Sequence, residues 1–220
     1  MSALLDVLTE HIDEFGGGLW VTLRLVGGAF AIAIVVGTLV AALRIAPSAW
    51  LQRLGGIYVE TFRNVPLLVL LTLSYAGLRR AGLPIDPWTA GIASLGLYTA
   101  AYVAEVLRSG VFAVSMGQIE ASLSLGFSYP QTLRRIVLPQ AFRTVIPPMG
   151  SITIAMIKNS AIVGASLIAL GDVLKNARIV QARTFQTEES FIWAAAGYLL
   201  LTVAATVAFR LLERRLAITR

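Results

Sequence analysis

The residues of this chain that could do chemistry are pairs of opposite charge inside long apolar runs. Glu60 and Arg63 stand three residues apart within one run, and Glu105 and Arg108 repeat that spacing near the end of another. Residues three apart in a helix share a face, so each pair can form an ion pair. Because ionised side chains are expensive inside a bilayer, such groups mark a functional site or a paired structural contact. The two pairs are therefore candidates for a gate or a partner contact, with an intrahelical salt bridge at the membrane interface as the alternative.

A third polar group, Lys158-Asn159-Ser160, interrupts a later apolar run that Pro147 and Pro148 already weaken. A helix that breaks at membrane depth frees backbone groups, which are tolerated only beside protein or a water-filled cavity. Transporters bind their substrates at such breaks. We therefore expect a break at residues 158–160. The alternative is a helix that reaches the outer surface with a polar end.

Five residues form the expected pathway for a solute, namely Thr61, Arg63, Lys158, Asn159 and Ser160. All five are cationic or neutral, while Glu60 and Glu105 each have an arginine at hand. A zwitterionic solute needs its charges matched in a partly dry cavity, because unmatched charges would not leave water. This lining favours an acidic or amide side chain over a second positive charge. For an amino acid solute, glutamate, aspartate or glutamine is then expected.

These groups have to be positioned by membrane helices. The 220 residues are 57% hydrophobic and only 14% charged, whereas soluble domains carry about 25% charged residues. Apolar runs near the length of a membrane span predict an all-α polytopic protein with five transmembrane helices. The expected spans are 19–43, 57–78, 88–107, 141–170 (interrupted at 158–160) and 191–212.

The placement of arginine and lysine sets the expected orientation. With the N-terminus outside, the cytoplasmic segments carry eleven cations against five outside, and cations favour the cytoplasmic side. We therefore expect an N-out, C-in, multi-pass protein of the cell membrane that contacts membrane lipid. Residues 1–18 are expected to form an amphipathic interfacial helix, with a frayed terminus as the alternative. Residues 19–212 would form one membrane domain with a cytoplasmic loop over 108–140, and 213–220 a cytoplasmic tail.

The composition argues against several other classes of protein. The chain has no cysteine, and its single histidine, His11, lies in an acidic stretch typical of a solvated surface, so no metal site is expected. Its net charge of +6 comes from cations that flank apolar runs, without the basic face and interleaved aromatics of a nucleic-acid-binding protein. No phosphate-binding glycine loop and no nucleophile elbow is present. We expect no catalytic residue and no bound cofactor in this chain.

The cytoplasmic loop carries small and turn-forming residues at regular places. Gly126 allows a sharp turn after a short helix, and Pro139 suits the first turn of the next helix, where no backbone donor is needed. Glu120 can cap a helix start or pair with a cation on a partner. The loop also offers an apolar knob for a cleft in a partner protein, made of Ala121, Leu123, Leu125 and Phe127.

The loop resembles the EAA loop of ABC importer permeases, in which E-A-A, three residues, G, nine residues and I-x-L-P follow one another. Every spaced position matches except Ser122, which replaces the second alanine. Phe62-Arg63-Asn64-Val65-Pro66-Leu67-Leu68 is similar to the F-R-x-x-P-L-L segment of polar amino acid permeases. Further similarity includes Tyr102-Val103-Ala104-Glu105. It extends over about residues 15–212 and points to glutamate and glutamine uptake permeases.

The resemblance implies a type I ABC permease fold for residues 19–212, with the EAA loop docking on two cytoplasmic ATP-binding subunits. A second permease subunit, identical or homologous, would complete a central path, and an extracytoplasmic solute-binding protein would deliver the cargo. ATP and Mg would be bound by the partner ATPase, and alternating access would move polar amino acids inward. The implied coupling residues are Glu120, Ala121, Ser122, Leu125, Gly126, Phe127 and Pro139.

Two other functions stay open at this point. A channel-type or structural membrane subunit would need no coupling loop, and uptake without ATP would favour it. An intramembrane enzyme would need a catalytic dyad at membrane depth, and no such pair stands out in the sequence.

Overall fold

The computed structural model describes residues 2–216, a part of the chain that is mainly helical and has no strand. Residues 217–220 of the expected cytoplasmic tail lie outside the described residues. Two short π-helical segments interrupt the α-helices. The helices, in chain order, are α1 (Ser2–Glu10), α2 (Ile12–Ile45), α3 (Ala49–Asn64), α4 (Leu67–Thr72), η1 (Leu73–Gly77), α5 (Leu78–Arg80), α6 (Pro87–Phe112), α7 (Met116–Ser124), α8 (Tyr129–Thr132), η2 (Leu133–Val137), α9 (Leu138–Ala165), α10 (Val173–Thr184) and α11 (Thr187–Leu216).

Three helices, α2, α6 and α11, are long and apolar enough to cross a bilayer. A fourth candidate is the broken pair made by α3 and the helical stretch Leu67–Arg80, which is bent by 99°. α9 has 28 residues, but its internal prolines and Lys158 make it less apolar than the other long helices. The all-helical class is confirmed, while the five-span count and the orientation stay predictions.

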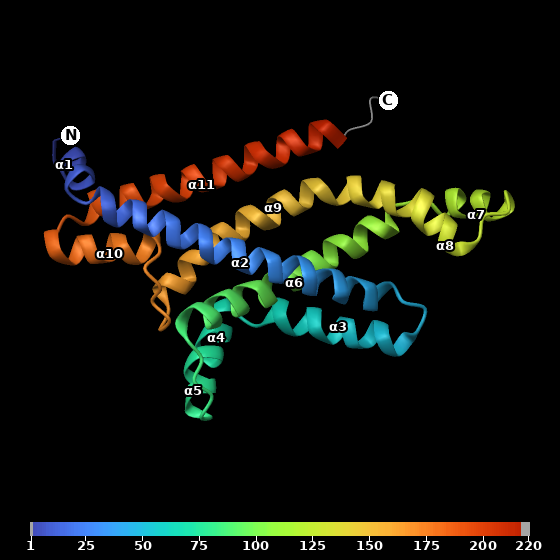
Figure 1. The fold of residues 1–220 in the computed structure, drawn as a ribbon, viewed down its shortest axis with the longest axis horizontal. Helices are drawn as coiled ribbons and strands as arrows, with labels where there is room; N and C mark the ends of the chain where they lie inside the picture. The colour runs from blue at the N-terminus through green and yellow to red at the C-terminus, as the bar shows by residue number, and fades with distance from the viewer. Residues whose placement is uncertain (1, 217–220) are drawn as a thin grey trace.

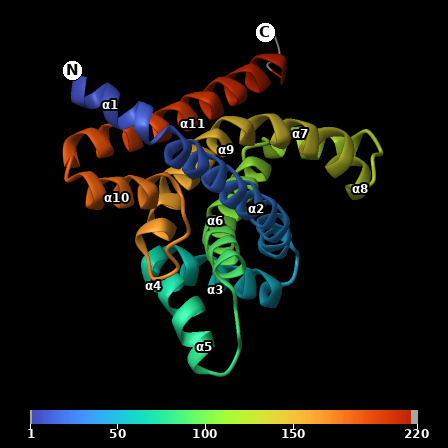
Figure 2. The same cartoon turned by 60° about the vertical axis from the view of Figure 1, so that its left-hand side comes forward.

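The long helices pack against one another, and several of the segments that join them lie near the two ends of the molecule. Figure 1 shows α1 and α10 at one end of the long axis and the α2–α3 turn with α7 and α8 at the other. In the turned view of Figure 2, α7 and α8 still project away from the bundle, as does α5 at another corner. The expected cytoplasmic loop is therefore a compact helical projection at one end of the bundle.

Small residues bring α2 and α6 into close contact. Gly37 faces Val103, whose side chain lies 2.7 Å from where a Cβ at position 37 would stand. Gly96 similarly faces Ile32 at 2.8 Å. Ala33 is fully buried beside this seam. Small residues at helix crossings let backbones approach and pack within a membrane, so α2 and α6 form one tightly packed unit.

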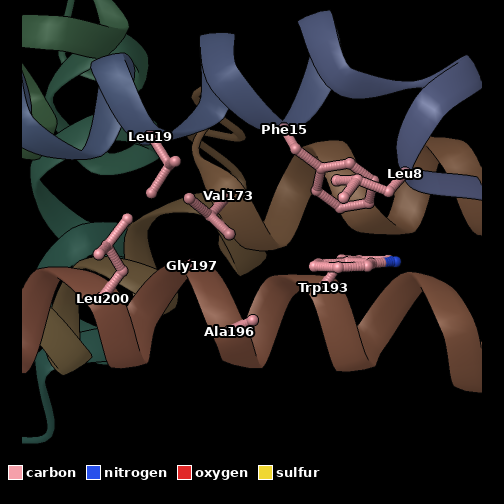
Figure 3. Close-up of a pocket in the computed structure, with 8 residues that line it drawn as sticks. All are labelled: Leu8, Phe15, Leu19, Val173, Trp193, Ala196, Gly197 and Leu200. Carbon is pink, nitrogen blue, oxygen red and sulfur yellow. The ribbon is translucent and has the colours of Figure 1, made fainter. Parts of the chain in front are cut away.

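The N-terminal segment forms the helix α1, which packs against its own chain. Val7 is buried, and the indole N–H of Trp193 on α11 donates to the carbonyl of Leu4 at 2.8 Å. Figure 3 shows Phe15 and Trp193 facing one another, around an apolar hollow of about 200 Å³. α1 is thus anchored to the outer end of α11 in the expected orientation.

α2 begins at Ile12, earlier than expected, and continues through the three glycines at 16–18. At Gly18 a Cβ would stand 2.9 Å from the backbone of Val173. The glycine therefore allows the start of α10 to cross α2 at backbone contact, and it does not end the helix.

A buried carboxylate fixes the start of α10. Asp172 is fully buried and accepts hydrogen bonds from the backbone N–H of Lys175 at 2.9 Å and from the Tyr198 hydroxyl at 2.8 Å. Gly164 lies against it, and a Cβ there would overlap the carboxylate. Removal from water raises the pKa of Asp172 to about 6, against the hydrogen bonds that lower it. The aspartate joins the connector to α9 and α11.

The structure corrects the expected positions of the helix breaks. Residues 57–78 were expected as one helix, but α3 ends at Asn64 and α4 begins after Pro66. Proline has no N–H to donate to the carbonyl four residues earlier, and its ring crowds that carbonyl. The expected break at 158–160 is wrong, because α9 is continuous there and the Ser160 hydroxyl donates to the Ile157 carbonyl at 2.6 Å.

Candidate functional site

The turn after α7 depends on a glycine in the left-handed conformation. Gly126 has φ +85°, and its N–H donates to the Leu123 carbonyl at 3.0 Å. The next N–H, of Phe127, reaches back to the Ser122 carbonyl at 3.1 Å. These two bonds form a Schellman cap, which satisfies carbonyls that a helix end leaves free. The glycine that the sequence singled out therefore ends α7 and reverses the chain.

Ser122 joins the two helices of the projection. Its hydroxyl lies 2.8 Å from the hydroxyl of Thr132, and both side chains are buried. α8 starts with a capping box in which the Ser128 N–H donates to the Gln131 side chain at 2.8 Å. The one departure from the E-A-A pattern thus supplies a hydrogen bond between α7 and α8 that alanine could not make.

Apolar side chains are presented at the tip of this projection. Leu125 is 79% exposed and Tyr129 is 66% exposed, while Ala121 and Glu120 are also exposed on α7. Phe127 is half-buried, with the guanidinium of Arg135 5.9 Å from its ring centre. Exposed large apolar side chains on a compact, hydrogen-bonded unit are typical of a docking surface.

The projection joins α9 through a widened helical turn. η2 covers Leu133–Val137, and Pro139 sits in the first turn of α9. Because Pro139 cannot donate to the carbonyl of Arg135, the regular α-helical ladder cannot run unchanged through this joint. π-helical turns occur frequently at functional sites. η2 therefore connects the projection to α9 with no loop between them.

One carboxylate serves two arginines at the end of α6. Glu105 pairs with Arg108, one turn on, at 2.7 Å, which confirms this pair. It also pairs with Arg44 at the end of α2. Gly55 makes room, because a Cβ there would stand 2.6 Å from the Arg44 side chain. Arg44 gives no local spacing signal in the sequence, because its partner lies 61 residues away.

The other expected pair is not formed. Among the ion pairs of residues 2–216 there is none between Glu60 and Arg63, and both side chains are exposed. The guanidinium of Arg63 instead lies 5.3 Å from the ring centre of Tyr102 on α6. The expectation that an arginine neutralises Glu60 is therefore wrong.

A cavity opens beside these residues at the broken second span. Its volume is about 340 Å³, and Glu60, Arg63 and Asn64 line it from α3 with Val59, while Tyr102 lines it from α6. Arg63 and Asn64 directly precede the break at Pro66. Transporters hold their substrates where a helix breaks at membrane depth. That break was expected at residues 158–160, but it lies at Pro66 instead.

Tyr102 also lines a second cavity, of about 180 Å³, between α6 and α9. Tyr98 lines it too, with its hydroxyl 3.0 Å from that of Tyr102, and Asn159 contributes from α9. Arg63 and Asn159 are thus brought to neighbouring cavities that share one tyrosine. The two tyrosines were missed as pathway residues, although their four-residue spacing places them on one helical face.

Three expected pathway residues do not join these cavities. Thr61 is exposed on α3, and Lys158 is exposed on α9, but neither lines either cavity. Ser160 is fully buried and bonds within its own helix. Asn159 lines a cavity while its neighbours Lys158 and Ser160 do not, because successive residues of a helix point about 100° apart.

Sequence comparison adds to this geometry. The family described as "Binding-protein-dependent transport system inner membrane component" matches residues 33–218. The chain belongs to this family. It is a membrane component without catalytic chemistry of its own, and the ATPase of such a transporter is a separate subunit.

Curated relatives match nearly the whole chain. The probable glutamine ABC transporter permease protein GlnM of Bacillus subtilis is 39% identical over 216 residues, covering 98% of this chain and 97% of the relative. The glutamate/aspartate import permease protein GltJ of Escherichia coli K12 is 34% identical, covering 94% and 89%. The arginine transport system permease protein ArtQ of Bacillus subtilis is also 34% identical, covering 90% of each chain.

A solved structure agrees in fold. An amino acid ABC transporter crystallised with histidines superposes with a TM-score of 0.89 at 35% identity, covering 94% of this chain and 96% of that one. This permease therefore has the type I fold, is a subunit of an amino acid ABC importer, and lies in the bacterial cell membrane as a multi-pass protein. ATP-binding subunits and a second permease subunit complete such a transporter.

Proposed function

We propose that this permease imports glutamine, glutamate or aspartate, and that the cavity at the broken second span binds the amino acid. The observation that carries the proposal is that Arg63 and an unpaired Glu60 line the same cavity of about 340 Å³. A cation and an acid in one partly dry site can match both charges of a zwitterion. Arg63 would take the α-carboxylate and Glu60 the α-ammonium.

The remaining lining favours a neutral or amide side chain. Asn64 and, in the neighbouring cavity, Asn159 offer amides, and Tyr102 offers a hydroxyl and a ring. Once Glu60 and Arg63 bind the charged groups of the zwitterion, the two cavities have no charged lining residue left for the side chain of the amino acid. Glutamine fits best, and the glutamine permease GlnM supports this choice at 39% identity. ArtQ, named for arginine, makes arginine the necessary competitor.

Coupling to the ATPase belongs to the loop over 108–140. The exposed tip at Leu125 would sit in a cleft of the ATP-binding subunit, and the bonds around Gly126 and Ser122 would keep α7 and α8 rigid. Closure of the ATPase dimer would move the projection, and the joint at Pro139 would pass that movement to α9. ATP and Mg would be bound by the partner, and an extracytoplasmic binding protein would deliver the amino acid.

Uptake by the reconstituted transporter, with its ATPase and binding protein, tests the cargo and the cavity. Arg63→Gln should reduce ATP-driven glutamine uptake roughly tenfold or more, because it removes a charged hydrogen bond worth about 1.5–3 kcal/mol. Arg53→Gln is the matched control, since Arg53 is exposed on the same helix and lines neither cavity. Glutamate and aspartate should compete with glutamine, but less strongly than glutamine itself, because no charged lining residue is left to match their side-chain carboxylate.

Three results would each contradict a different part of the proposal. Arginine or lysine competing better than glutamine and glutamate would overturn the cargo assignment. Equal uptake by the Arg63→Gln and wild-type transporters would remove the cavity from the path. Uptake that proceeds without ATP would favour the channel-type alternative.

A further inference from the structure

A large apolar groove lies near the cytoplasmic ends of α2, α6 and α9, apart from the amino acid cavities. Its volume is about 570 Å³, within the range of about 300–1,000 Å³ seen for small-molecule sites. Its lining is almost entirely hydrocarbon. The residues are Thr38, Ala41, Ala42 and Ile45 from α2, Leu107 and Val111 from α6, and Leu138, Pro139, Ala141, Phe142 and Val145 from α9.

The groove and the amino acid cavities use opposite sides of α6. Leu107 and Val111 follow Tyr102 by five and nine residues, which places them roughly 140° to 180° around the helix axis at 100° per residue. Tyr102 lines the two cavities of the proposed amino acid path. The groove therefore opens away from the proposed path, toward the bilayer, and Phe142 on its wall is 58% exposed.

Two arginines are sequence neighbours of residues that line the groove, since Arg44 precedes Ile45 and Arg108 follows Leu107. Arg44 and Arg108 share the single carboxylate of Glu105, so this trio keeps one positive charge. Arg134 is exposed about one turn before Leu138. Cationic pockets at the cytoplasmic face attract the phosphate groups of anionic lipids. The same place thus offers an apolar slot for a hydrocarbon chain and a positive field for its headgroup.

We propose that this groove binds an acyl chain of an anionic phospholipid from the cytoplasmic leaflet. Leu138 and Pro139 belong both to the groove wall and to the end of the coupling loop. A bound chain fills the space beside the joint of α9 and stiffens the connection between the projection and the membrane helices. Lipid binding itself does not depend on the cargo, so its failure is distinguishable from failure of the proposed function.

Photocrosslinking in nanodiscs tests the proposal with the complete transporter. The probe is a phosphatidylglycerol with a diazirine near the end of one acyl chain, and mass spectrometry maps the labelled peptides. Labelling is expected in residues 38–45 and 138–145. Ala42→Phe fills the groove and should reduce labelling several-fold, whereas Ala31→Phe, at an exposed position of α2 outside the groove, should not. Thr38→Phe provides a second groove variant at an exposed position.

Uptake measurements and a cysteine crosslink test the proposal further. Phosphatidylglycerol should raise ATP-driven uptake over phosphatidylcholine alone in the wild type and in Ala31→Phe, and the gain should shrink in Ala42→Phe. Labelling unchanged by both groove variants would overturn the proposal, and equal labelling by a phosphatidylcholine probe would overturn the anionic headgroup. The native chain has no cysteine, so a Phe142→Cys variant that forms a disulfide with a second copy would show that protein covers the groove.

Discussion

Gly126 has a backbone φ of +85°, a conformation that side chains with a Cβ rarely adopt. No other atom lies near the place of its missing Cβ, so crowding is not the reason for glycine here. The conformation itself is the reason, because the two hydrogen bonds of the cap form only when the chain reverses at this residue. The requirement at Gly126 can thus be separated from packing by experiment.

Gly126→Ala should weaken coupling without preventing assembly of the transporter. Alanine in the left-handed region costs about 1–2 kcal/mol, which would loosen the end of α7 and reduce uptake per ATP hydrolysed. Gly117→Ala is the matched control, since Gly117 lies within α7 with open space around it and no positive φ. The measurement is the ratio of uptake to hydrolysis in proteoliposomes. An unchanged ratio in Gly126→Ala would show that this cap does not matter for coupling.

Between helices, the charge cluster of Arg44, Glu105 and Arg108 ties α2 to α6 at the end that leads into the projection. The small residues of the α2–α6 seam already hold these helices together along their length. The cluster adds a directional contact where α6 ends, so the two helices should move as one body when the projection moves. This role can be tested by charge reversal.

Arg44→Glu and Glu105→Arg should each reduce the thermal stability of the complex and the uptake rate, since each places like charges together. The double reversal restores the Arg44–Glu105 contact with opposite sign and should recover part of both losses. Because these side chains are partly exposed, a coupling energy of about 1 kcal/mol is expected in the double-mutant cycle. Arg53→Glu, on a residue with no ion pair among the described residues, is the control. Additive losses in the cycle would rule out a direct contribution from the pair.

Sequence reasoning located the elements more reliably than their breaks. Long apolar runs identified α2, α6 and α11 because length and hydropathy are properties of single segments. The break at Pro66 was not predicted, although the proline stands in the sequence. Whether a proline bends a helix sharply depends on which residues pack beside it after folding. Lys158-Asn159-Ser160 did not break α9, since a hydroxyl bonded within the helix and neighbouring helices packed around it.

At the scale of the whole molecule, the turn and the joint of the loop over 108–140 could be predicted closely, and the proposed amino acid site only in part. The loop is local, so the spacing from Glu120 to Pro139 contained its turn and its joint. The site is assembled from α3, α6 and α9, and its members meet only after folding. Of the residues expected to line the path, Arg63 and Asn159 line the cavities and Lys158 does not. Tyr98 and Tyr102 line a cavity too, but only their four-residue spacing could have indicated them.

The orientation of the complete bundle is the last expectation that an experiment can decide. The native chain has no cysteine, so single cysteines can be labelled with a membrane-impermeant maleimide without background. Arg178→Cys lies on the exposed side of α10 and Ser48→Cys lies in the α2–α3 turn, at opposite ends of the long axis in Figure 1. In the N-out arrangement, Arg178→Cys should react in intact cells and Ser48→Cys only after permeabilisation, because three spans separate them.

Each other outcome has a distinct meaning for the fold in the membrane. The reverse pattern would invert the topology and place the projection of α7 and α8 outside the cell, where no ATPase could dock. Reaction of both cysteines from the same side would mean that an even number of crossings separates them. In that case either the broken pair of α3 with Leu67–Arg80 or the less apolar α9 would not cross the bilayer. The cationic ends of α2, α6 and η2 make the first pattern the expected one, since all three would then face the cytoplasm.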